Sequence, residues 1–388
     1  MNPPNRAVFN APNERDGELR GWRLGRVRAA MTATLLRRAL DAYDAPVTAL
    51  RAAKDVTDLA HRVAPWGDHM VLHRGRVFGR QARPGFPSHA FDRFIGVELN
   101  KQRPYRAGFD LPTALVAVTR RCALRCQHCS AWESRGPSDP LSIEALRAVV
   151  AALLDRGVAH LELTGGEPLL RLDAVEAIAR DASTLADVWV LTSGAPMTAE
   201  HARRLADAGV TGVMVSLDHW DATRHDAFRG VEGTFDHALE AMTLTRDEGL
   251  LVGASFTATR ATANPTDLLR VVGVARKHGA SFVRLLDPQP ADGGRTKTSR
   301  SAQHSAPRWP RSQRPPAPRG PTARRSSRSP TPPRATRTAE RAAACSSTRR
   351  ETSTDARSAA TPRATCSATA STHRSRGSAA TGATMRRS

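Results

Sequence analysis

The sequence lacks any run of about 18 apolar residues, which is the shortest stretch that reads as a membrane-spanning helix. Its first residues, MNPPNRAVFNAPNERDG, also lack the apolar centre of a secretory signal peptide. Only five cysteines occur in 388 residues, and three of them are clustered, which does not fit a disulfide framework. We therefore expect a cytoplasmic protein without a membrane partner, in a reducing compartment where thiols are free to bind metal.

The C-terminal quarter of the chain lacks the residues that build a core. Residues 295–388 contain no Leu, Ile, Val, Phe or Tyr, and they carry 21 Lys and Arg against three Asp and Glu. The chain's net charge of +21 therefore comes mainly from this segment, and the preceding residues are nearly neutral. A segment of this composition cannot bury enough apolar surface to offset its chain entropy. We expect residues 291–388 to be a disordered tail.

Two explanations of this tail remain open. It could be a basic arm that binds RNA or another polyanion, in which case nucleic acid is a partner. It could instead result from a shift of reading frame near DPQPADGGRTK. The chain would then be either a truncated, non-catalytic remnant or an enzyme that is still active without its original C-terminal part. We favour the frame shift, because the composition changes directly after the last predicted strand and the helix expected to follow that strand is missing.

Between positions 111 and 286, short apolar runs alternate with amphipathic helical patterns. Ser142 and the Asn264–Pro265 pair are placed to begin helices, and Asp173 and Glu176 have the spacing of a capping box. Repeated strand–helix units predict parallel strands joined by right-handed crossovers. The fold class is therefore α/β, as a partial (β/α)6 TIM-like barrel or an open doubly wound sheet. The six apolar runs predict strands at 113–119, 160–164, 188–192, 212–218, 252–259 and 281–286.

The residues before this region carry no chemical motif. Residues 1–108 contain amphipathic helical segments, and HMVLHRGRVFGR has the pattern of a β-hairpin. We interpret them as a mainly helical N-terminal extension that packs on the barrel or presents a surface to a partner. The domain boundaries that follow are 1–108 for the extension, 109–290 for the core and 291–388 for the tail.

The three clustered cysteines stand in the sequence CALRCQHC. Cys122, Cys126 and Cys129 have the spacing C-x3-C-x2-C and directly follow the first core strand, where the active-site loops of α/β barrels lie. Three thiolates on one short loop can hold three irons of a [4Fe–4S] cluster and leave the fourth iron open. A structural zinc ion asks for four ligands, and His128 is poorly placed as the fourth because it lies within the loop beside Cys129. The spacing therefore favours a cluster with one open iron.

This motif resembles that of the radical SAM superfamily, with His128 at the position that is usually aromatic. The resemblance implies a partial barrel in which the open iron binds S-adenosylmethionine. One electron then cleaves the sulfonium, and the 5′-deoxyadenosyl radical takes hydrogen from a substrate. The resemblance covers roughly residues 111–290. The segment RHDAFRG resembles the matching segment in the branch that contains the molybdenum-cofactor, pyrroloquinoline-quinone and sulfatase-maturing enzymes. The implied partners are a reductant such as flavodoxin or ferredoxin and a substrate that is a peptide or a cofactor precursor.

The resemblance also implies cofactor-binding positions beyond the cysteines. Gly165, Gly166 and Glu167, in LTGGEP, match the motif that receives the methionine amino group. Taken alone, these residues would form an ordinary turn that leads into a helix. The remaining candidates follow the third and fourth strands, where each could instead cap a turn or form a surface ion pair. They are Ser193 facing the cofactor, Ser216 and Asp218 at the ribose, and Arg229 at the carboxylate.

Overall fold

The computed structural model describes residues 17–63, 70–79, 81–103, 110–259 and 262–287. All of them belong to one structural unit, within Met1–Arg314. No helix among these residues has both the length and the apolar character that crossing a membrane requires. The predicted tail at 291–388 lies outside the described residues.

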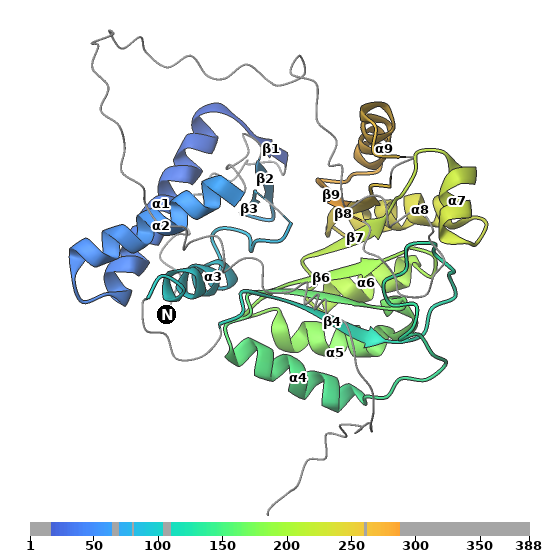
Figure 1. Cartoon of the computed structure of the whole chain (residues 1–388), viewed down its shortest axis with the longest axis horizontal. Helices are drawn as coiled ribbons and strands as arrows, with labels where there is room; N and C mark the ends of the chain where they lie inside the picture. The colour runs from blue at the N-terminus through green and yellow to red at the C-terminus, as the bar shows by residue number, and fades with distance from the viewer. Residues whose placement is uncertain (1–16, 64–69, 80, 104–109, 260–261, 288–388) are drawn as a thin grey trace, which may run out of the picture. The chain divides into compact units, whose positions relative to one another are not determined.

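The centre of the fold is a six-stranded parallel sheet with the order β4-β5-β6-β7-β8-β9 (Figure 1). The strand order follows the chain and never reverses, so the open doubly wound alternative is wrong and the barrel-like winding is confirmed. β4 and β9 are the two edges and do not pair with each other, which makes the barrel partial. The six strands are β4 (Thr113–Thr119), β5 (His160–Gly165), β6 (Asp187–Thr192), β7 (Gly212–Ser216), β8 (Leu251–Thr257) and β9 (Phe282–Leu286).

The crossover helices begin mostly where the sequence predicts. The Ser142 hydroxyl accepts a hydrogen bond from the Ala145 amide, and Asn264 caps the last helix just before Pro265. The predicted capping box of Asp173 and Glu176 is wrong, because both carboxylates lie inside a helix and pair with Arg204 instead. The helical segments of this region are α4 (Ile143–Asp155), the 3-10 turn η2 (Pro168–Arg171), α5 (Leu172–Ala182), α6 (Ala199–Asp207), α7 (Ala222–Arg229), α8 (Thr234–Asp247) and α9 (Pro265–Lys277).

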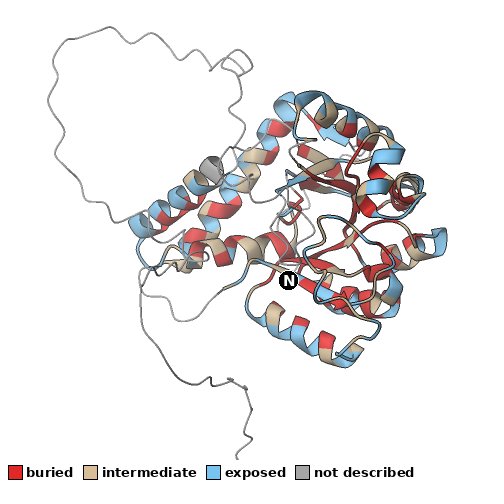
Figure 2. Cartoon of the chain, turned by 45° about the vertical axis from the view of Figure 1, so that its right-hand side comes forward, coloured by how far each residue is buried: buried red, intermediate tan, exposed pale blue. Residues whose placement is uncertain are grey.

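Alternate residues of each strand serve two different cores. On β6, Val188 and Val190 point outward into the large cluster beneath the helices, and Trp189 points into the barrel. Figure 2 shows the buried residues concentrated along the strands and the inner faces of the helices. The central strands β5 to β8 are therefore buried on both faces, which explains why their sequences are nearly continuous apolar runs.

The N-terminal region combines three helices with a small antiparallel sheet of order β1-β2-β3. The predicted hairpin is confirmed as β2 and β3, and β1 adds a strand that the sequence did not reveal. Phe78 of β3 packs with Trp189 of the barrel interior. The elements are β1 (Gly17–Leu19), α1 (Gly21–Ala42), α2 (Pro46–Val63), β2 (Met70–His73), β3 (Arg76–Phe78) and α3 (His89–Asn100).

A largely buried ionic network crosses the barrel interior, and it includes Gln81 of the N-terminal region. Glu162 of β5 pairs with Arg284 of β9, and Gln81 binds both side chains. Burial opposes ionisation of Glu162, but hydrogen bonds from His160 and Arg284 outweigh it and lower the pKa of Glu162 to about 2. The network thus joins strands that lie far apart in the sheet order and ties them to the N-terminal region.

Candidate active site

The cysteine loop begins where β4 ends, at the carboxyl edge of the parallel sheet. Cys122, Cys126 and Cys129 are free thiols of intermediate burial, and a turn brings the Cys129 amide to the Cys126 carbonyl oxygen at 3.4 Å. Among the residues that the structure describes, no three His, Cys, Asp or Glu side chains converge as ligands of a single ion. A cubane cluster makes a different demand, because each thiolate binds its own iron. The donor set fits a [4Fe–4S] cluster with three protein ligands.

Main-chain hydrogen bonds fix this loop against the end of α7. The amides of Arg125 and Gln127 donate to the carbonyl oxygens of Arg229 and Phe228, both at 3.0 Å. Gly230 follows with a positive φ of 73°, and a Cβ there would lie 2.8 Å from the Arg125 carbonyl oxygen. The segment RHDAFRG therefore supports the cysteine loop through its backbone.

The double glycine lets β5 approach the same loop from the other side. The Gly166 amide donates to the Thr119 carbonyl oxygen and the Glu167 amide to that of Arg121, each at 2.8 Å. A Cβ on Gly166 would lie 2.2 Å from the Arg121 carbonyl oxygen and 2.9 Å from the Cys122 Cβ. Gly165 and Gly166 are thus packed against the residues that precede the first cysteine, and no larger side chain fits there.

The Glu167 side chain is buried and faces the end of β6. One carboxylate oxygen accepts from the Thr192 hydroxyl at 2.6 Å and from the Leu169 amide at 3.2 Å. The other accepts from the amide and hydroxyl of Ser193 at 2.9 and 2.6 Å. The structure therefore brings Glu167 and Ser193 together, and their contact joins the ends of β5 and β6.

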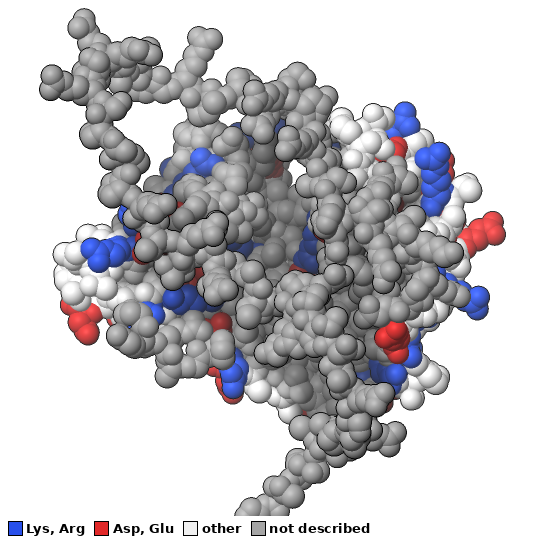
Figure 3. Space-filling model, in the orientation of Figure 1, with Lys and Arg blue, Asp and Glu red and all other residues white. Residues whose placement is uncertain are grey.

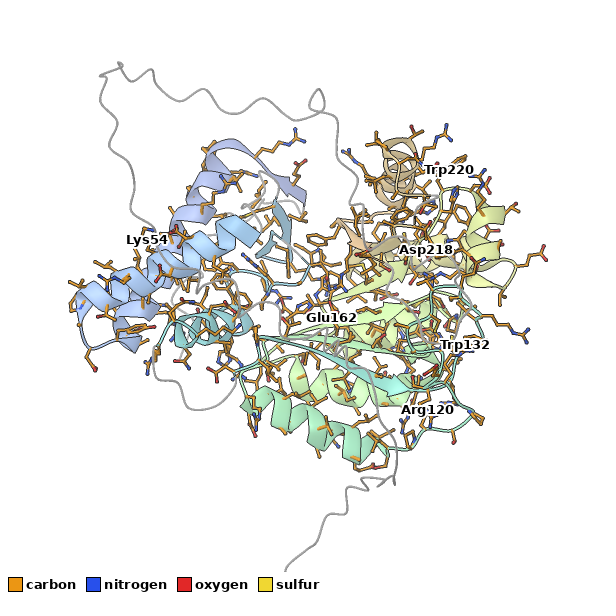
Figure 4. The ribbon with its side chains drawn as sticks, viewed as in Figure 1. Lys54, Arg120, Trp132, Glu162, Asp218 and Trp220 are labelled. Carbon is orange, nitrogen blue, oxygen red and sulfur yellow. The ribbon has the colours of Figure 1, made fainter. Side chains whose placement is uncertain are left out.

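The inner side of the loop faces a buried ion pair. Arg229, 7% exposed, pairs with Asp218, 3% exposed, and its Nη1 donates to the Cys126 sulfur at 3.6 Å (Asp218 is labelled in Figure 4). The other Asp218 oxygen accepts from the Thr257 amide at 2.8 Å. Burial opposes ionisation of Asp218, but the charge of Arg229 outweighs it, so the pKa of Asp218 is lowered. The pair is therefore ionised and holds a guanidinium at Cys126.

Two of the thiols, Cys122 and Cys126, resist ionisation without a metal. Burial raises the pKa of Cys122 and, despite the nearby charge of Arg229, that of Cys126 as well. A thiolate at these positions needs a positively charged partner, which iron supplies.

His128, next to Cys129 in the loop, packs against α7. Its ring stacks on Phe228 with centroids 4.6 Å apart and planes inclined by 8°. Its Nδ1 is buried without a hydrogen-bond partner among the described residues. A buried ring nitrogen without a partner calls for a polar group from a ligand. Ser216 lies farther along the same edge, with its hydroxyl 3.5 Å from that of Ser255.

The structure thus gathers every predicted site residue at the carboxyl ends of β4 to β7, but it groups them in pairs that the sequence did not show. Glu167 meets Ser193, and Asp218 meets Arg229. Sequence reasoning missed Phe228, although it stands next to Arg229 in the segment that was singled out. It also missed Thr192, whose only signal is its place at the end of a strand.

Two kinds of comparison with known proteins agree on this domain. The sequence profile described as Radical SAM superfamily matches residues 116–271. An AdoMet-dependent heme synthase of Nitratidesulfovibrio vulgaris is 35% identical over 144 residues, covering 37% of this chain and 39% of that protein. A GTP 3′,8-cyclase of Acidothermus cellulolyticus is 31% identical over 191 residues, covering 46% and 52% of the two chains. The chain therefore spans only about two fifths to one half of these relatives.

Among solved structures, Streptococcus suis SuiB bound to S-adenosylmethionine matches with a TM-score of 0.42 and 15% identity, over 48% of this chain and 42% of that one. The profile match covers the cysteine loop, the double glycine and the Asp218–Arg229 pair. Residues 116–271 therefore carry a radical SAM domain.

Proposed function

We propose that this protein is a radical SAM enzyme, with Cys122, Cys126 and Cys129 as the protein ligands of a [4Fe–4S] cluster. One observation carries the proposal: three free cysteines with the C-x3-C-x2-C spacing lie on one loop, against the double glycine, inside the matched domain. When bound, the cluster supplies the electron that cleaves S-adenosylmethionine to methionine and a radical that takes hydrogen from a substrate.

The residues around the loop would position the cofactor. We assign Gly165, Gly166 and Glu167 to its methionine end, because the glycine backbone is accessible beside Cys122 and the carboxylate adds negative charge near an ammonium group. His128 offers its unpartnered Nδ1 as a polar contact beside the cluster. Ser193 would then act mainly by holding Glu167.

Residues at and after the end of β7 would contact the ribose and the cluster. Ser216 is half-buried, and its hydroxyl can bind a sugar diol. Asp218 and Arg229 were expected at the ribose and the carboxylate, but their charges are engaged with each other and with Cys126. We propose that this pair orients the Cys126 thiolate and sets the electrostatic potential at the cluster, since hydrogen bonds to ligand sulfurs tune such centres.

The names of the two relatives found by sequence support one class of substrate. They are an AdoMet-dependent heme synthase and a GTP 3′,8-cyclase. We propose a small precursor of a cofactor as the substrate, and a one-electron reductant such as flavodoxin or ferredoxin as the partner. The free thiols favour the reducing cytoplasm as the location.

The test is reconstitution of the full chain with iron and sulfide in the absence of oxygen. We expect about four irons per chain and 5′-deoxyadenosine that forms only when a reductant is present. Cys126→Ala should lose both, and Cys366→Ala, outside the described residues, is the matched control and should keep both. Iron at control level without any 5′-deoxyadenosine would contradict the assigned chemistry.

A further inference from the structure

A cavity of about 480 Å³ lies beside the cysteine loop, and its lining includes Cys122 but neither Arg229 nor Asp218. Arg120 and Trp132, two of its lining residues, are labelled together at the carboxyl end of β4 in Figure 4. The wall combines three arginines with one of the proposed cluster ligands. Its residues are Arg120, Arg121, Cys122, Trp132, Arg135, Gly136, Pro137 and Leu170.

The arginines of this cavity are held in place mainly by uncharged acceptors. Arg120 Nε donates to the Ser134 carbonyl oxygen at 2.5 Å, and Arg135 Nη2 donates to that of Cys122 at 2.6 Å. Arg121 is the exception, because its Nε also binds the Asp139 carboxylate at 3.1 Å. Carbonyl groups orient a guanidinium without cancelling its charge. Within the described part of the chain, the guanidinium groups of Arg120 and Arg135 therefore form no ion pair, although the Arg120 amide donates to the Asp139 carboxylate at 2.8 Å.

The cavity also has the features of a protein contact. The Arg135 guanidinium stacks on the Trp132 ring at 4.8 Å, and Arg and Trp are the residue types that dominate binding energy at interfaces. On the face drawn in Figure 3, charges of both signs are interspersed along the rim of the described residues. The clustered arginines of the cavity would steer an acidic partner toward this one site.

The position of Cys122 links this surface to the proposed chemistry. Cys122 lines the cavity, and its carbonyl oxygen accepts a hydrogen bond from Arg135. A molecule bound in the cavity would therefore lie next to one of the proposed cluster ligands. The inner side of the loop is closed by the buried pair of Arg229 and Asp218. The cavity is therefore a side from which a protein can reach Cys122.

We propose that this basic cavity is the docking surface for an acidic one-electron carrier protein, which delivers the electron through the Cys122 side of the cluster. The inference rests on the proposed function. A small anionic substrate in the same cavity is the competing occupant, and the experiment separates the two.

The experiment measures 5′-deoxyadenosine formation by the reconstituted full chain with two electron sources. Dithionite is a small reductant that needs no docking, and reduced flavodoxin is an acidic protein. For Arg120→Glu, we expect the half-saturating flavodoxin concentration to rise about tenfold or more. The dithionite-driven rate and the iron content should stay within about twofold, because Arg120 touches neither the loop's thiols nor the inner side. Raising the salt concentration should weaken flavodoxin-driven turnover of the unaltered chain.

Two further variants keep the outcome decisive. Arg120→Gln removes the charge without reversing it and should give a smaller rise. Arg156→Glu reverses an exposed charge at the far end of α4 and should behave like the unaltered chain. If flavodoxin saturates Arg120→Glu normally, or if both electron sources lose activity equally with iron retained, the docking role is wrong, and the second result points to a small anionic ligand. Absence of 5′-deoxyadenosine with dithionite in the unaltered chain would instead refute the proposed function.

Discussion

At the scale of single residues, Arg229 and Asp218 should act on the cluster with opposite signs. Arg229→Gln removes the positive charge at Cys126, so the cluster's reduction potential should fall by roughly 60 mV, a tenfold change for a one-electron couple. Asp218→Asn leaves that charge uncompensated, so the potential should rise by a similar amount. The measurement is a potentiometric titration of the reconstituted cluster followed by electron paramagnetic resonance.

Controls separate this effect from damage to the fold. Arg125→Gln removes an exposed positive charge from the same loop and should leave the potential nearly unchanged, because solvent screens it. The double variant Arg229→Gln with Asp218→Asn removes both buried charges and should lie between the single variants. Shifts of equal sign in both single variants would show that the pair acts only through structure.

Gly166 tests whether the double glycine supports the cysteine loop by close approach. Gly166→Ala places a Cβ 2.2 Å from the Arg121 carbonyl oxygen, so the loop must move. We expect a loss of about 1 to 3 kcal/mol in the free energy of unfolding, together with reduced iron content. Gly96→Ala, in α3 with nothing within 4 Å of the added Cβ, is the control and should be neutral or slightly stabilising. Full iron content in Gly166→Ala would contradict the supporting role.

At the scale of elements, the pair of Glu162 and Arg284 connects β5 to β9 across the barrel interior. The folded pKa of Glu162 is about 2, below its ordinary value of 4.5, so its ionisation stabilises the fold above pH 4.5 and that contribution is lost as the pH falls toward 2. The contribution at neutral pH is on the order of 3 kcal/mol. Urea unfolding of Glu162→Gln should therefore show lower stability at pH 7 and a weaker dependence on pH between 4.5 and 2.

The exposed Glu232 supplies the matched control for this pair. Glu232→Gln should retain the stability of the unaltered chain at pH 7 and its loss at low pH. If Glu162→Gln unfolds with the same pH profile as the unaltered chain, the network does not stabilise the barrel.

The six core strands could be predicted from the sequence because each is an apolar run, and β5 to β8 are buried on both faces. Glycines marked the ends of the helices between them. Gly157, Gly209, Gly249 and Gly279 all have the positive φ that such ends require. The strand β1 escaped prediction because it is three residues long and is fixed only by pairing with β2, far away in sequence. The capping box failed because Arg204, on the next helix, offered Asp173 and Glu176 a stronger partner.

The candidate site divides in the same way. The cysteines and Gly165–Gly166 follow from local spacing, since each motif is a short continuous stretch of sequence. The pairs Glu167–Ser193 and Asp218–Arg229 depend on how strands and helices come together, and side chains distant in sequence give no pattern. The basic cavity likewise arises from packing around Arg120 and Arg135.

At the scale of the whole molecule, the acidic and basic residues of the domain nearly balance, and the excess charge lies at 295–388. A chain truncated after Gly294 should therefore lose any salt-dependent affinity for RNA and retain the iron content and the 5′-deoxyadenosine of the full chain. Filter binding at several salt concentrations and the reconstitution assay check the two halves of this prediction. Loss of bound iron on truncation would show that the tail contributes to the domain.

The central claim is that three cysteines hold a cluster whose fourth iron is open to S-adenosylmethionine. The most direct measurement is the electron paramagnetic resonance spectrum of the reduced, reconstituted protein before and after S-adenosylmethionine is added. The cluster signal should change shape on addition, because the ligand binds an iron directly. A cluster signal that stays the same at saturating S-adenosylmethionine would contradict it.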